Sequence, residues 1–119
     1  MEAYERARQH LIGLGYLVYA PGQHTGRCEA AYVVLRKGST SRMIESRHVG
    51  YDLLDVNCYV PLDQYAELAA MVRGVKGHMR ALRAQLRPTG YETPDVIEDQ
   101  YRAHSRSIEY QVYRMLQGG

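Results

Sequence analysis

The stretch that decides the fold is Leu54-Asp55-Val56-Asn57-Cys58-Tyr59-Val60, in which apolar and polar side chains alternate. Successive side chains of a strand point to opposite faces, so one face would carry only the apolar groups of Leu54, Val56, Cys58 and Val60. The other face would carry Asp55, Asn57 and Tyr59. This pattern predicts a strand with one face on a core and the other toward water or a partner, and it places the Cys58 thiol inside.

A long helix is predicted directly after this strand. Pro61 ends the strand, and Asp63 is the expected N-cap of the helix. Apolar side chains then recur at spacings of three and four over roughly five turns, at Tyr65, Leu68, Val72, Val75, Met79 and Leu82. We expect this helix to cover the apolar face of the sheet and to hide the side chains of Leu54, Val56, Val60, Ile108 and Val112.

The rest of the chain supplies a second helix and further strands. Residues 1–14 are amphipathic and predict a helix that ends at Gly15, in a left-handed C-cap. Three more strands are predicted from β-forming runs at 16–20, 31–35 and 103–115. Residues 84–100 are expected to be irregular because they contain three helix breakers, Pro88, Gly90 and Pro94. The order predicts an α+β fold in a single domain over residues 1–119. A mostly antiparallel sheet of about four strands would be packed by one long helix, with an N-terminal helix and an extended polar hairpin or loop added.

The composition narrows the class of protein. The 119 residues fit one domain, and the net charge of +2 is too small to indicate nucleic-acid binding by itself. Eleven tyrosines but no phenylalanine or tryptophan favour half-exposed rings, or rings covered by neighbouring subunits. Cys28 and Cys58 are too few for a disulfide framework and indicate buried thiols in a reducing compartment. Since there is no signal core and no apolar run of ~18 residues, we expect a soluble protein made in the cytoplasm, with no membrane partner.

Residue types suited to catalysis or metal binding are present, but their spacing is not. His24 and Cys28 are four apart in a predicted loop, and a structural zinc would need two more ligands that the sequence does not place nearby. The acidic residues of a small nuclease would be Asp52, Asp55, Glu98 and Asp99, without a lysine at the spacing that such enzymes use. No glycine motif for a nucleotide is found. We therefore expect no enzyme activity, no metal and no cofactor.

A basic segment lies between two predicted strands. Residues 36–50 would form a polar loop or hairpin in which only Glu45 opposes the basic side chains, which are Arg36, Lys37, Arg42, Arg47 and His48. This segment is either a solvated loop or a contact for an acidic partner surface or passing DNA. One copy would bind phosphates weakly, because affinity grows with the number of phosphates neutralised, whereas several copies around a ring would bind more strongly. These five residues are the candidate partner-binding site.

Several segments resemble a family of small proteins from tailed bacteriophages and prophages of Gram-positive bacteria. They are YLVYAPGQHTGRCEAAYVV at Tyr16–Val34, the region 51–65 with its CYVPLDQY stretch, RPTGYETP, and SIEYQVYRM. The order of elements is also similar to that of lambda-type tail terminators. These have an N-terminal helix, a strand that ends in an aromatic-Val/Leu-Pro step, a helix, and a C-terminal strand near a Y-x-x-Y pattern. The resemblance covers nearly the whole chain, with the basic segment as its most divergent part.

The resemblance implies a structural role in the neck of the virion. Tail terminators form a hexameric ring that stops polymerisation of the tail tube and gives the docking surface for the head connector. The implied partners are copies of this chain, the tail tube protein and the head connector or head-closure protein, with genomic DNA passing through the channel without sequence readout. The implied location is the virion, after assembly in the host cytoplasm. A head-closure or connector protein of the same neck is the nearest alternative, followed by a small nuclease and a DNA-binding regulator.

Overall fold

The structure is a computed structural model that describes residues 2–39 and 52–112. Its elements are α1 (Ala3–Gly13), β1 (Val18–Tyr19), β2 (Tyr32–Ser39), β3 (Asp52–Pro61), η1 (Leu62–Gln64), α2 (Tyr65–Met79), η2 (Arg80–Leu82), β4 (Leu86–Glu92), β5 (Val96–Glu98), η3 (Asp99–Tyr101) and β6 (Ala103–Val112). Six strands form one sheet in the order β1-β2-β3-β6-β4, and β5 also pairs with β6. The β1–β2 pair is parallel and the others are antiparallel. The predicted α+β fold is confirmed, with six strands in place of about four.

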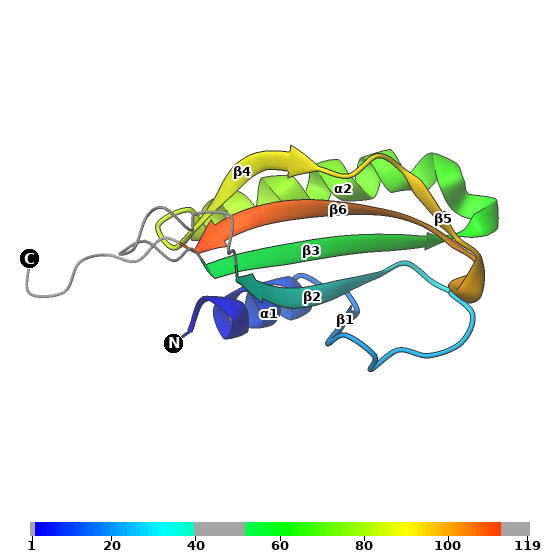
Figure 1. The fold of residues 1–119 in the computed structure, drawn as a ribbon, viewed down its shortest axis with the longest axis horizontal. Coiled ribbons are helices and arrows are strands. Elements are labelled where there is room, and N and C mark those ends of the chain that lie inside the picture. The colour runs from blue at the N-terminus through cyan, green and yellow to red at the C-terminus, as the bar shows by residue number, and fades with distance from the viewer. Residues whose placement is uncertain (1, 40–51, 113–119) are drawn as a thin grey trace, which may run out of the picture.

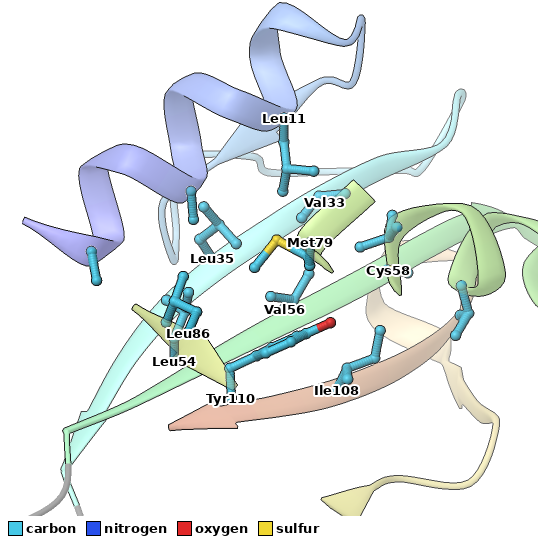
Figure 2. Close-up of a cluster of buried hydrophobic side chains, with 14 of the residues drawn as sticks. Leu11, Val33, Leu35, Leu54, Val56, Cys58, Met79, Leu86, Ile108 and Tyr110 are labelled. Carbon is cyan, nitrogen blue, oxygen red and sulfur yellow. The ribbon is translucent and has the colours of Figure 1, made fainter. Parts of the chain in front are cut away.

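Both helices cover the same face of the sheet (Figure 1), and the core lies between them and the strands. Strand β3 is central, and its register places Val56 beside Leu35 of β2 and Ile108 of β6. The predicted apolar face of β3 is buried, since Leu54, Val56, Cys58 and Val60 are at most 1% exposed. Figure 2 shows how Leu11 of α1 and Met79 of α2 reach toward these strands. Each such buried aliphatic side chain contributes roughly 1.5–3 kcal/mol to folding.

Helix α1 ends as its sequence predicts. Gly15 has a φ of +98°, and its N–H donates to the carbonyl of Ile12 at 3.0 Å. The next N–H, that of Tyr16, donates to the carbonyl of Leu11 at 3.1 Å. These two bonds form a Schellman motif, which satisfies two carbonyls at the end of the helix. The turn directs the chain from α1 into β1 at the edge of the sheet.

Helix α2 begins differently from the prediction. Asp63 lies in the short helix η1, and the N-cap position of α2 is occupied by Gln64, which makes no side-chain capping bond. The 3-10 turn that follows Pro61 leads the chain into the helix, so no capping side chain is needed at Asp63. The predicted packing face of α2 is confirmed at Leu68, Val72, Val75 and Met79, which are buried. The prediction is wrong for Tyr65, which is 50% exposed, because its hydroxyl donates to Asp95 at the surface. Leu82 of η2 and Val112 of β6 are only partly buried.

Residues 84–100 were expected to be irregular, and this prediction is wrong, because they contain β4 and β5. Both strands lie on the outer side of β6, at an edge of the sheet, where a strand tolerates proline. The register shifts between Pro88 and Glu92, around Gly90 with its φ of +93°. An interrupted edge strand therefore accommodates the same residues that exclude a helix.

A polar network ties the β4–β5 segment to α2. The Tyr65 hydroxyl donates to Asp95 at 2.6 Å, and the Arg106 guanidinium binds the same carboxylate at 2.7 Å. Lys76 pairs with Glu92, whose carboxylate lies 3.7 Å from Arg106. The hydrogen bond from the Tyr65 hydroxyl is the main cause that lowers the pKa of Asp95 below its usual value, and Arg106 lowers it further. The network fixes the edge of the sheet that carries β5.

Candidate interaction surfaces

The face of the sheet opposite the helices is polar and ordered. Its middle row joins three strands, because the Asn57 amide donates to the carbonyl of Val34 at 3.0 Å and Ser107 donates to the Asn57 side-chain oxygen. One step along, Arg36 lies 3.7 Å from Asp55. This is the polar face that the alternation of β3 predicts. We call it the outer face.

Aromatic rings gather at one end of the outer face. Tyr32 is sandwiched between His24, whose ring centroid lies at 4.3 Å, and Tyr59, at 4.8 Å. Tyr19 meets the Tyr32 ring edge-on, and Tyr101 meets the Tyr59 ring in the same way. Together with Cys28, Val34 and Ala103, the four tyrosine rings form a second, smaller core. The loop between β1 and β2 is thereby held against the sheet.

A trough of about 360 Å³ runs beside these rings. Its lining comes from the β1–β2 loop, the outer face and the β5–β6 region, and consists of Ala20, Pro21, Gly22, His24, Tyr32, Val34, Arg36, Asn57, Tyr59, Glu98, Tyr101, Ser105 and Ser107. Ser105 donates to the Glu98 carboxylate at 3.2 Å, which holds that carboxylate at the trough. The pKa of the Tyr59 hydroxyl is raised, mainly by burial and to a smaller extent by the nearby Glu98 carboxylate, whereas Arg36 acts in the opposite direction. Burial also raises the pKa of Tyr32.

The predicted basic site is divided by the fold. Arg36 and Lys37 were expected in a polar loop or hairpin, and both lie in β2, which extends to Ser39 and pairs with β3 as far as Asp52. Neighbouring side chains of a strand point to opposite faces. Arg36 therefore lines the trough, whereas Lys37 lies on the helix side, where its ammonium group is 2.7 Å from Glu2. Arg42, Arg47 and His48 lie outside the described residues.

The two edges of the sheet expose different apolar side chains. At the β1 edge, Ile12, Leu14 and Leu17 are exposed; at the β4–β5 edge, the exposed side chains are Tyr91, Val96 and Ile97. Figure 1 shows these edges on opposite sides of the sheet, with β1 below and β4 and β5 above. The two edges therefore present different apolar side chains to the surroundings.

The four carboxylates considered for a nuclease are not brought together. Asp52 and Asp55 lie in the first half of β3, while Glu98 pairs with Ala103, which pairs with Pro61 at the other end of β3. Six residues of strand separate Asp55 from Pro61, which is a distance of ~20 Å. A reaction centre cannot be shared over that length. Absence of enzyme activity stays a prediction.

The two proposed zinc ligands are engaged in packing. The His24 ring stacks on Tyr32, and the buried Cys28 thiol donates to the carbonyl of Ala30 at 3.4 Å. Within residues 2–39 and 52–112, no three histidine, cysteine or acidic side chains are grouped in a way that could hold a metal ion. Over the same ranges, none of the helices has the length and apolarity that crossing a bilayer requires.

No family model, curated protein or solved structure matches the chain.

The sequence did not predict the trough, because the residues that line it come from four separate segments of the chain. The alternation of β3 places Tyr59 and Asn57 on the open face, and the tyrosine content indicates half-exposed rings. Nothing in the local pattern indicates that Glu98 and Tyr101 lie beside them. That proximity depends on the pairing of β5 with β6, which the proline-rich segment conceals.

Proposed function

We propose that this chain is a structural protein of the neck of a tailed bacteriophage, a tail terminator or tail-completion protein. Six copies form a ring that caps the tail tube and provides the docking surface for the head connector. The genome passes through the channel of the ring without sequence readout. The protein acts by binding and assembly, not by catalysis, and it joins the virion in the host cytoplasm. The segments that resemble tail terminators support this role.

The observation that carries the proposal is the presence of two unlike apolar edges. A head-to-tail contact joins two different surfaces of the same chain, and repeated contacts of this kind close into a ring when the rotation is right. A two-fold dimer would instead use one surface twice. Leu17 is 49% exposed at one edge and Ile97 is 59% exposed at the other. Burial of both in each contact would remove these side chains from water.

The test is the mass of the assembly in solution. Light scattering on the purified protein should give a hexamer, and electron micrographs should show rings with six subunits. Leu17→Glu and Ile97→Glu place a charge in one edge each without touching the core, so each variant should be folded and should fail to close a ring. Ala70→Glu adds the same charge on the exposed side of α2, between the two edges, and should assemble normally. A wild-type protein that remains a monomer even within purified tails would refute the proposal.

Mixing the two edge variants tests the head-to-tail geometry. Each variant keeps one unaltered edge: Ile97→Glu keeps the β1 edge, and Leu17→Glu keeps the β4–β5 edge. In a 1:1 mixture these two unaltered edges can make one contact. The mixture should therefore form heterodimers that each variant alone does not form. If the chain is a tail terminator, we also expect a particular gene order, with capsid genes before its gene and a tail-tube gene after it.

A further inference from the structure

The trough on the outer face contains a carboxylate without a cationic partner. Glu98 accepts a hydrogen bond from Ser105 at 3.2 Å, and no lysine, arginine or histidine forms an ion pair with it among residues 2–39 and 52–112. A neutral hydroxyl satisfies only one of the several acceptor positions of a carboxylate. Glu98 is partly buried, so water serves the remaining positions less fully than at an open surface. The site therefore favours a positively charged donor.

Aromatic rings stand next to this carboxylate. Tyr59 and Tyr101 line the trough together with Glu98, and their ring planes are nearly perpendicular, with centroids 6.4 Å apart. The Tyr59 hydroxyl is neutral near pH 7, and burial and the Glu98 carboxylate raise its pKa further above the ordinary value. Neutral tyrosine rings attract cations that lie over their faces. A carboxylate beside such rings has the chemistry that suits an organic cation.

We propose that this trough receives an arginine side chain of a protein partner. A guanidinium group is planar, so it can stack on a tyrosine ring while its N–H groups donate to Glu98. A lysine ammonium group fits less well because it is compact, strongly hydrated and cannot stack. An anion is disfavoured by the charge of Glu98. The proposal goes beyond ring formation, since it concerns the outer face and not the two edges.

Arg36 sets the orientation of the incoming side chain. It lines the same trough and lies 3.7 Å from Asp55, so its own charge is partly balanced within the chain. Its guanidinium is held toward β3 by that contact and is not paired with Glu98. The remaining positive charge repels a second guanidinium at that part of the trough. A bound arginine is therefore directed toward Glu98 and Tyr59.

The experiment uses Nα-acetyl-arginine amide as the probe and Nα-acetyl-citrulline amide as its uncharged isostere. The chain contains eleven tyrosines and no tryptophan, so its intrinsic fluorescence comes from tyrosine and reports on rings that contact the probe. NMR shifts of the tyrosine ring protons give the same titration independently. We expect saturable, weak binding of the arginine probe, weaker binding of Nα-acetyl-lysine amide, and no binding of the citrulline probe.

Three variants separate the proposed contacts from a general surface effect. Glu98→Gln keeps an acceptor for Ser105 but removes the charge, and it should weaken arginine binding by about tenfold or more. Arg36→Gln removes the repulsive charge and should tighten binding by about twofold. Glu67→Gln removes an exposed carboxylate on α2 and should change nothing. Equal binding of the arginine and citrulline probes, or unchanged binding by Glu98→Gln, would overturn the proposal. Either result leaves the hexameric ring untouched, because the ring is tested by mass.

Discussion

Two glycines in α2 offer a matched test of the packing around this helix. Gly77 is exposed, and a methyl group added to its Cα would meet nothing within 4 Å. Glycine in the interior of a helix costs about 1 kcal/mol relative to alanine, because it loses more backbone freedom on folding. Gly77→Ala should therefore raise the free energy of unfolding by about 1 kcal/mol, which is roughly 4 °C in Tm for a chain of this length.

Gly74 provides the comparison. A methyl group at Gly74 would lie 3.3 Å from the Tyr16 hydroxyl oxygen, which is closer than ordinary contact. The Tyr16 ring also packs edge-on against His78, so it cannot move away without losing that contact. Gly74→Ala should gain clearly less than Gly77→Ala. In a Tyr16→Phe background the hydroxyl is gone, and Gly74→Ala should then gain nearly as much as Gly77→Ala.

Urea denaturation followed by circular dichroism at 222 nm measures these differences. The midpoints of the five proteins (wild type, the two glycine variants, Tyr16→Phe, and Tyr16→Phe with Gly74→Ala), with the slope of unfolding held in common, give the changes in free energy directly. Equal gains from Gly74→Ala and Gly77→Ala in the wild-type background would refute the assigned contact between Tyr16 and α2. A loss of stability in Gly77→Ala would refute the assignment of Gly77 to the exposed side of the helix.

Three further predictions concern the core, the pH dependence and the basic segment. Val56→Asp should unfold the domain, because it places a charge at a fully buried position, and retention of a cooperative thermal transition near the wild-type Tm would contradict this. Burial raises the pKa of Cys58 from 9.0, and that of Tyr110 from 10.0, to about 12 in both cases. The unfolded chain loses these two protons at lower pH than the folded chain does. The stability that Cys58 and Tyr110 contribute in their protonated form is therefore complete below pH 9 and is lost as the pH rises toward 12. Equal free energies of unfolding at pH 8 and at pH 11 would contradict this prediction. Arg42→Glu combined with Arg47→Glu should leave the fold intact and weaken assembly or docking to the tube, whereas normal tail length and infectivity would exclude a role for the segment.

Local patterns in the chain were sufficient for the elements whose periodicity is strong. The alternation around Val56 identified the central strand and its buried face, and the three-and-four spacing from Tyr65 identified α2 and its packing side. The glycine at position 15 identified the end of α1. These features are set by interactions between residues close in sequence, or by burial of one whole face. For such elements, side-chain periodicity alone carries the information.

Tertiary pairing decided what local patterns could not. Pro88 and Gly90 are compatible with a strand only because β4 lies at an edge of the sheet, and that position is set by β6, some twenty residues later. The same pairing brings Glu98 to the trough. Arg36 and Lys37 appeared as one basic site in the sequence, and the pleat of β2 places them on opposite faces. The sequence by itself therefore determined the class of fold and the buried faces of β3 and α2, because burial follows periodicity there. Only the tertiary structure decided which polar and exposed apolar residues share a surface, because that depends on contacts between distant segments.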